Sequence, residues 1–229
     1  MSEIVIISLG GSVLAPSQID VGFLQQFRQL IMKFVHNGGC RFAIICGGGK
    51  TAREYQNAAR NVVHAVPEDL DWLGIHATRL NAHLLRTIFR EIAHAKLVKN
   101  PNEKIKLKAS ERVVVAAGWK PGRSTDHIAV LLAKNLGAKT VINITNTDYV
   151  YDKDPTKFSD ARPLRQTSWK EFRKLIGVTR WSPGLNTPFD PVAAKVAEKI
   201  RLKVVVIGKG LRNLEGFLVR KAFKGTVIS

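Results

Sequence analysis

Short apolar runs recur along the chain, and most of them end in glycine or in a polar turn. Runs of Val, Ile, Leu and Ala without polar alternation are typical of strands buried on both faces of a parallel sheet. We predict strands over residues 3–9, 41–46, 112–117, 139–145 and 203–207.

Between these runs the apolar residues follow helical spacing. We expect helices over residues 20–38, 50–63, 70–95 (one helix or two), 125–136 and 190–200. Thr125 and Asp190 are suited to cap the last two helices, and Pro191 fits a first helical position. The polar segments 101–110 and 146–166 are expected to be irregular. The alternation of strand, glycine turn and helix predicts an α/β fold with a mostly parallel central sheet that helices cover on both faces.

Composition limits the classes of function. The 229 residues fit one large domain or two joined lobes. Lys and Arg outnumber Asp and Glu by 36 to 18, a formal net charge of +18, which favours anionic ligands. A nucleic-acid partner is disfavoured because neither zinc-finger spacing nor an aromatic-basic stripe is present. A solvated basic surface stays an alternative.

Two further features concern the surroundings of the protein. The only cysteines, Cys40 and Cys46, are too few for a disulfide framework and are expected to be small buried apolar residues. No signal-peptide pattern and no apolar run near the roughly 20 residues of a membrane span is found. We therefore expect a soluble, cytoplasmic protein.

Glycine clusters follow two of the predicted strands, at Gly10-Gly11-Ser12 and at residues 47–50. Glycines at a strand end let backbone N–H groups approach a phosphate, and a following helix N-terminus adds a favourable dipole. A third glycine loop spans residues 118–122. Phosphate binding is favoured over simple tight turns because three such loops are expected at one sheet edge. The P-loop pattern fails, since its first glycine would have to stand at Ile44.

The glycine loops and their downstream partners resemble the amino acid kinase family, and within it the uridylate kinases of the archaeal type. The matching segments are LGGSVL (9–14), CGGGKTAREY (46–55), DLDWLGIHATRLNA (69–82), AAGWKPGRSTDHIAVLLA (116–133), ITNTDYVYDKDP (144–155) and FDPVAAKVAEK (189–199). They occur in the family's order and span nearly the whole chain.

The resemblance implies a fold and an activity. The expected fold is a three-layer αβα sandwich forming a single domain over residues 1–229. Within it, about residues 1–138 would bind the acceptor and about 139–229 would bind ATP. The expected enzyme is a nucleoside monophosphate kinase that phosphorylates UMP to UDP with ATP, in pyrimidine biosynthesis. The resemblance also implies a homo-oligomer, in this family often a hexamer.

The resemblance assigns roles to individual residues as well. The catalytic set comprises Lys195, Arg53 and Asp126. The ATP-binding set comprises Gly11, Ser12, Gly49, Arg53, Thr145, Asn146, Tyr151, Lys153 and Asp154. The UMP-binding set comprises Gly48, Asp71, Gly118, Trp119, Lys120, Pro121, Gly122, Arg123, Ser124 and Thr125. Mg²⁺ would arrive with ATP, and no residue is assigned as a metal ligand.

The residue types suit phosphoryl transfer, which needs two phosphates brought together and their charge neutralised. Lys195 has the reach for the transferring group, and Arg53 can hold phosphate oxygens bidentately. Each candidate also has an ordinary alternative: Arg53 and Lys195 as solvated helix positions, Asp126 as a first-turn helix charge, and Asp71 as a surface cap.

Two departures from the family pattern affect this interpretation. Most relatives have a lysine where this chain has Ser8, so charge neutralisation would rest on Lys195, Arg53 and the metal, with Lys50 as a conceivable substitute. Tyr149 replaces a glycine, and if that position needs a positive φ angle the loop should be strained or rerouted. The alternatives are a kinase of another small phosphate, such as isopentenyl phosphate, and a non-catalytic nucleotide-binding protein.

Overall fold

The computed structural model describes residues 4–179 and 187–229, and its centre is a seven-stranded sheet. The strands are β1 (Ile4–Leu9), β2 (Arg41–Cys46), β3 (Val113–Ala116), β4 (Thr140–Thr145), β5 (Val150–Tyr151), β6 (Pro163–Leu164), β7 (Gln166–Thr167), β8 (Lys203–Gly208) and β9 (Thr226–Ile228). The sheet order is β3-β2-β1-β4-β8-β9-β7, while β5 and β6 pair separately. All neighbours in the large sheet are parallel except β8 and β9.

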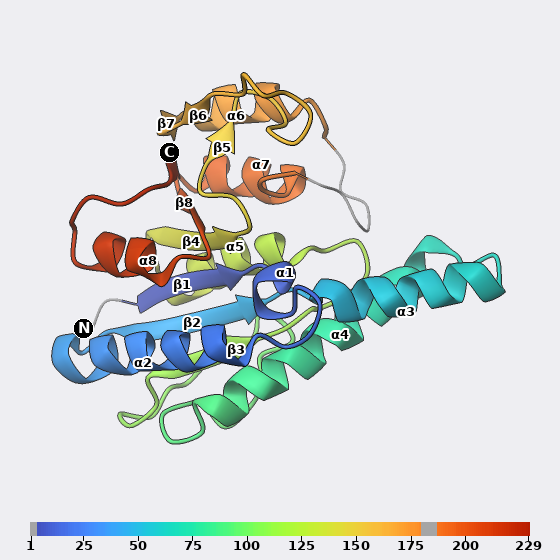
Figure 1. Ribbon diagram of the computed structural model, residues 1–229. Helices are drawn as coiled ribbons and strands as arrows, with labels where there is room; N and C mark the ends of the chain where they lie inside the picture. Colours follow the sequence, from blue (N-terminus) through green and yellow to red (C-terminus); the bar gives the residue numbers. More distant parts are fainter. Residues whose placement is uncertain (1–3, 180–186) are drawn as a thin grey trace.

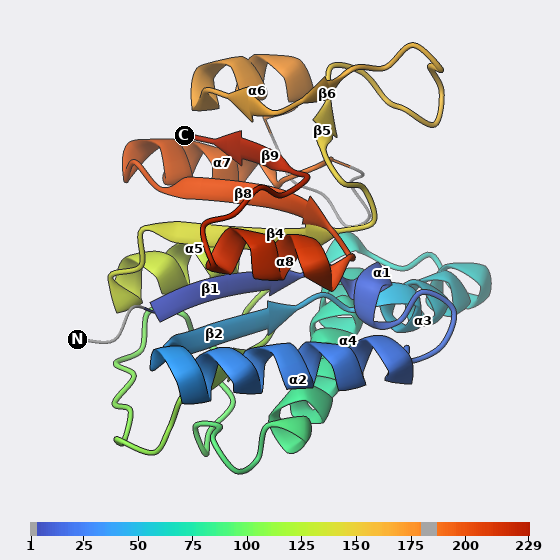
Figure 2. The same ribbon diagram turned by 60° about the vertical axis from the view of Figure 1, so that its left-hand side comes forward.

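Helices cover both faces of this sheet. They are α1 (Gly11–Leu14), α2 (Val21–Gly38), α3 (Gly49–Val62), α4 (Pro67–Ile88), α5 (Thr125–Leu136), α6 (Trp169–Ile176), α7 (Pro191–Lys199) and α8 (Leu211–Leu218). Figures 1 and 2 show α2 and α8 on one face and α5 and α7 on the other. The predicted three-layer αβα sandwich is therefore confirmed.

The alternation of side chains along each strand builds two cores. In β1, Ile7 and Leu9 pack in the core beneath α2 and α8, whereas Ile6 packs with α5 and α7. Because both faces are covered, the central strands have no polar face and read as continuous apolar runs. Ser8 is an exception, a polar residue with 2% exposure on the α5 side of β1.

Most predicted elements are confirmed within one or two residues, although residue 3 lies outside the described part. Asp190 caps its helix as expected and Asp20 caps α2, but Ser124, not Thr125, caps α5. The segment expected to be one or two helices over 70–95 is the single helix α4, which begins at Pro67 and ends at Ile88. Residues 89–98, which the prediction had included in the helix, instead form turns and run parallel to β3, with isolated bridges from Ala93 to Val113 and from Val98 to Ala116.

The C-terminal half contains the larger differences. The segment 146–166 was expected to be irregular, yet it forms the two-stranded sheet of β5 and β6, and β7 follows at its end. Helices α1, α6 and α8 and strand β9 were not predicted. Cys46 is buried as expected, whereas Cys40 is only half-buried.

The carboxyl ends of β1, β2, β3, β4 and β8 share one edge of the sheet, since all five are parallel. The connection from β1 leads to β2 on one side and the chain returns to β4 on the other, so the order reverses between β1 and β4. Ligands bind at such a switch point in open α/β sheets. Helices α3 and α4 extend past this edge (Figure 1).

No helix in the described part is both long and apolar enough to cross a membrane.

Candidate active site

The glycine loops after β1 and β2 touch each other at the carboxyl edge. The N–H of Gly47 donates to the carbonyl of Leu9 at 3.0 Å, and that of Lys50 to the carbonyl of Ala15 at 3.2 Å. A Cβ atom on Gly11 would lie 2.1 Å from the backbone nitrogen of Gly49. Gly49 itself has a φ of +62°. Only glycine permits this contact, so the two predicted phosphate loops form one continuous backbone surface.

Side chains of α4 hold the second glycine loop in place. Asn81, with 2% exposure, donates to the carbonyls of Gly47 and Gly48 at 2.9 and 3.3 Å. Because these carbonyls point at Asn81, the carbonyl oxygens do not compete for the space a phosphate would take. On the outer side, the Arg53 guanidinium lies 3.4 Å from the hydroxyl of Ser12. The structure thus brings Arg53, Ser12, Gly11 and the second loop together, as the sequence predicted.

Asp71 and the loop after β3 line a cleft on the acceptor side. A carboxylate oxygen of Asp71 accepts from the N–H of Gly122 at 2.7 Å. Burial raises the pKa of Asp71, and the hydrogen bond from Gly122 partly opposes this. The cleft has a volume of about 640 Å³ and is lined by Pro67, Glu68, Asp71, Lys120, Pro121, Gly122 and Arg123. Asp71 is therefore not a surface cap, because only 9% of it is exposed.

The base of the same loop is fixed by α4. The Thr78 hydroxyl accepts from the N–H of Gly118 at 2.8 Å, and Arg79 donates to the carbonyls of Gly118 and Trp119. A Cβ on Gly118 would lie 2.7 Å from the Thr78 hydroxyl. The Lys120 ammonium lies 4.4 Å from the centre of the Trp119 ring. Hydrogen bonds to α4 therefore anchor the start of the loop at Gly118 and Trp119, and the cations Lys120 and Arg123 follow this anchor.

Asp126 joins three elements where α5 and α7 begin. One of its carboxylate oxygens accepts from the Ser8 hydroxyl of β1 at 3.1 Å, and the other from the N–H of Asp190 at 3.1 Å. Burial raises the pKa of Asp126 to about 7, and the charge of Asp190 adds to the effect. The two hydrogen bonds act in the opposite direction. Asp126 is therefore more than a first-turn helix charge, and it titrates near neutral pH.

Two buried polar atoms beside this junction have no partner in the described structure. They are the second carboxylate oxygen of Asp190 and the Nδ1 of His127, whose residues are 4% and 7% exposed. Asp190 uses its other oxygen to cap α7 through the N–H of Ala193. The pKa of His127 is lowered by burial and by the Arg123 guanidinium, against the pull of Asp190. Buried unpaired polar atoms are uncommon and tend to mark functional regions.

The candidates for the ATP side lie on the segment after β4. The Thr145 hydroxyl accepts from the Thr147 N–H at 3.2 Å, and Asn146 is exposed beside it. Tyr151 is half-buried in β5, with its ring 6.4 Å from that of Tyr149. Tyr149 does not have a positive φ angle, so the strain expected from its replacement of glycine is absent.

Further along this segment, the charged candidates are engaged locally. Lys153 pairs with Asp160 at 2.6 Å and lies 5.3 Å from the centre of the Phe158 ring. The Asp154 carboxylate accepts from both the N–H and the hydroxyl of Thr156, which lowers the pKa of Asp154. Both residues therefore stabilise the turn at 154–158 in this structure.

Lys195 lies on the exposed side of α7, one turn after the Asp190 cap. It lines a cleft of about 320 Å³ with Lys170, Arg173, Lys174, Val178, Thr179 and Pro191. The sequence did not predict this cluster of cations, because α6 was not recognised as a helix.

Four residues with positioning roles were missed by the sequence reasoning: Thr78, Arg79, Asn81 and Asp190 in its contact with Asp126. Asp71, Thr78 and Asn81 recur on one face of α4 among apolar core positions. Polar residues at helical spacing on an otherwise apolar face were a signal of a buried polar function. The contact between Asp190 and Asp126 joins residues 64 positions apart and left no such signal.

Comparisons with known proteins find relatives that match nearly the whole chain. The sequence model of the amino acid kinase family matches residues 3–208. The uridylate kinase of Thermoplasma volcanium is 36% identical over 96% of this chain and 95% of its own length. That of Pyrococcus abyssi is 35% identical over 98% of both chains. The crystal structure of uridylate kinase from Archaeoglobus fulgidus superimposes with a TM-score of 0.84 at 33% identity, covering 99% of this chain and 100% of that one.

Proposed function

This chain belongs to the amino acid kinase family, and from that premise we propose that it is a UMP kinase. It transfers the terminal phosphoryl group of ATP to the phosphate of uridine monophosphate and produces UDP and ADP, a step of pyrimidine nucleotide synthesis. The observation that carries the proposal is the contact between the two glycine loops at the switch point, with the Asp71 cleft on one side and the segment after β4 on the other.

The two substrates are proposed to occupy different parts of this edge. Residues 1–138 bind UMP: Gly48 and the loop from Gly118 to Thr125 surround its phosphate, while Asp71 accepts from the ribose or base. Residues 139–229 bind ATP through the segment after β4 and α7. A carboxylate at the centre of the acceptor cleft suits sugar hydroxyls or base N–H groups better than an apolar acceptor such as isopentenyl phosphate.

Catalysis in this arrangement is mainly positioning and charge neutralisation. The backbone N–H groups of the glycine loops hold the phosphates between donor and acceptor, and Arg53 with Lys195 neutralises the charge that develops on the transferring group. Asp126 positions α7 against β1 through Ser8 and the N–H of Asp190.

Mg²⁺ enters with ATP in this proposal. Among the described residues no group of three or more His, Cys, Asp or Glu side chains is placed to hold a metal ion. Mg²⁺ is ordinarily bound by one or two carboxylates together with substrate phosphates, so the nucleotide would supply most of its ligands. We further propose that the protein works in the cytoplasm as a homo-oligomer, as the family resemblance implies.

The test is a coupled assay of ADP release with Mg²⁺ and ATP, comparing UMP with CMP, AMP and isopentenyl phosphate. Turnover confined to UMP supports the proposal, and turnover with another acceptor would move the substrate while keeping the site. Lys195→Ala should lower kcat about 100-fold or more, whereas Lys199→Ala, one turn further along α7, should leave it near the wild-type value. A chain that binds ATP but turns over none of the four acceptors would be a nucleotide-binding protein instead.

A further inference from the structure

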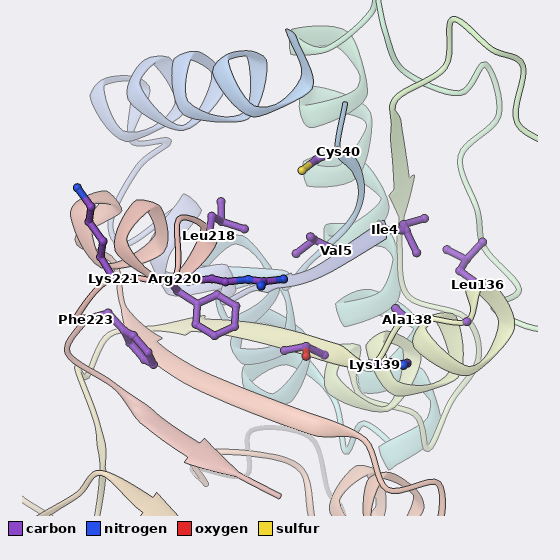
Figure 3. A pocket seen from close by; sticks show the side chains of 13 residues that line it. Ile4, Val5, Cys40, Leu136, Ala138, Lys139, Leu218, Arg220, Lys221 and Phe223 are labelled. Atoms are coloured by element: carbon purple, nitrogen blue, oxygen red, sulfur yellow. The ribbon is translucent and has the colours of Figure 1, made fainter. Parts of the chain in front are cut away.

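A second cavity lies at the opposite edge of the sheet from the glycine loops. It has a volume of about 810 Å³, well within the range of small-molecule sites. Its lining comes from the amino ends of β1 and β4, the turn after α5 and the C-terminal end of α8, and includes Ile4, Val5, Lys139, Leu218, Arg220 and Phe223 (Figure 3). None of its lining residues belongs to the proposed kinase site.

The walls and the charges of this cavity differ in character. Aliphatic and aromatic side chains form most of the wall, and Thr140 carries the only hydroxyl among the described lining residues. Lys139, Arg220 and Lys221 line the cavity, although the ammonium of Lys221 points away from it (Figure 3), and the described lining contains no carboxylate. Their charge exceeds the partial negative charges of the C-termini of α5 and α8 that end here, each of which amounts to about half a charge. The cavity is thus apolar with a net positive rim.

Arg220 is held over the cavity by an unusual backbone conformation. Its φ is +58°, and its N–H donates to the Phe217 carbonyl at 3.0 Å in the turn that ends α8. Glycine is the usual residue at such a left-handed position after a helix, because a side chain there is strained. In Figure 3 the guanidinium of Arg220 reaches across the cavity, whereas the ammonium of Lys221 points away from it. The strain therefore places a bidentate anion donor above apolar walls.

From these observations we propose that this cavity is a binding site for a small amphipathic anion. Arg220 and Lys139 hold the anionic group of the ligand, and Val5, Leu218 and Phe223 contact its apolar acyl or aromatic body. A nucleotide fits poorly, since the described lining offers the hydroxyls of a ribose no carboxylate acceptor and a single side-chain hydroxyl, that of Thr140. The site is separate from the kinase site, so the inference does not depend on the proposed reaction.

The test is fluorescence titration with 8-anilinonaphthalene-1-sulfonate, an aromatic sulfonate, in the presence of saturating UDP and ADP to keep the kinase site filled. The neutral N-phenyl-1-naphthylamine serves as the uncharged probe. Arg220→Gly removes the guanidinium and gives the turn its preferred residue, so the variant should fold. Arg201→Gly is the matched control, because Arg201 also has a positive φ, +53°, at the end of α7 and does not line the cavity.

We expect Arg220→Gly to weaken binding of the sulfonate about 10-fold and Arg201→Gly to change it less than about 2-fold. The neutral probe should bind about equally to all three proteins. Displacement by decanoate would identify an acyl anion as the ligand class, and displacement by naphthyl phosphate an aromatic one. Equal sulfonate affinity in both glycine variants would overturn the proposal and leave Arg220 as a cation that serves only the C-terminus of α8.

Discussion

Replacing Asp126 with asparagine tests the electrostatics of the junction between β1, α5 and α7. An asparagine side chain at this position can keep both contacts, because its carbonyl can accept from the N–H of Asp190 and its amide can donate to the Ser8 oxygen. The substitution therefore removes the ionisable group with little change in shape. What it changes is the charge beside Asp190.

The sign and size of the effect follow from the pKa. Burial and Asp190 raise the pKa of Asp126 from 3.8 to about 7, so the folded protein holds a proton that the unfolded chain releases between those pH values. Stability from this group is present at low pH and is lost as pH rises toward 7. The full shift corresponds to about 4 kcal/mol. Because Asp126 is partly open to solvent, we expect between about 2 and about 4 kcal/mol.

The assay is urea unfolding followed by circular dichroism between pH 4.5 and 8. The free energy of unfolding of Asp126→Asn relative to wild type should rise by that amount across this range. Asp20→Asn is the control, since it removes a carboxylate that caps α2 far from the junction and asparagine caps equally well. A difference between Asp126→Asn and wild type that stays constant with pH would refute the reasoning.

Four further substitutions, one of them a control, address the glycine loops, Asp71 and the hydrogen bond between His94 and Glu111. Gly49→Ala should cost about 2 to 4 kcal/mol of unfolding free energy and abolish turnover, because its Cβ would lie 2.4 Å from the Gly11 carbonyl oxygen. Gly177→Ala has the same positive φ but open space and should cost only about 1 kcal/mol, both measured by urea unfolding. Asp71→Asn should raise KM for UMP about 10-fold with a smaller change in kcat in initial-rate measurements, and an unchanged KM would exclude contact with UMP. The hydrogen bond to His94 lowers the pKa of Glu111, so the stabilisation that the ionised Glu111 gives the fold is present above pH 4.5 and is lost as pH falls. We expect Glu111→Gln to lower the free energy of unfolding by about 1 kcal/mol at pH 7 and by almost nothing at pH 3, as measured in thermal melts.

The sheet was predictable because its central strands are buried on both faces. Runs such as residues 41–46 contain no polar face that would suggest another structure, and β2 has the predicted bounds. The carboxyl-edge rule then brought the glycine loops together without any knowledge of distances. The contact between Gly11 and Gly49 is the consequence of that rule.

The C-terminal elements were harder to predict because tertiary contacts form them. Strands β5 and β6 have two residues each, and the N–H of Val150 is satisfied by the Thr226 hydroxyl from the far end of the chain. Helix α6 did carry a signal, since Ser168 and Glu171 form a capping box before the apolar Phe172. The start of α4 likewise had one in Pro67, a first-position proline.

Ser8 and the raised pKa of Asp126 have a common origin. The family resemblance implies a lysine at the position of Ser8 in most members, although some archaeal-type members lack it, and an ammonium there would stand beside the carboxyl that Ser8 contacts at 3.1 Å. A neighbouring cation lowers the pKa of a carboxyl, but here the nearest charge that acts on Asp126 is the negative one of Asp190. Without the lysine, a proton on Asp126 relieves the repulsion between the Asp126 and Asp190 carboxylates near neutral pH. Charge neutralisation then rests on Lys195, Arg53 and the metal that enters with ATP, and we expect turnover in this chain to be more sensitive to pH between about 6 and about 8 than a lysine at residue 8 would allow.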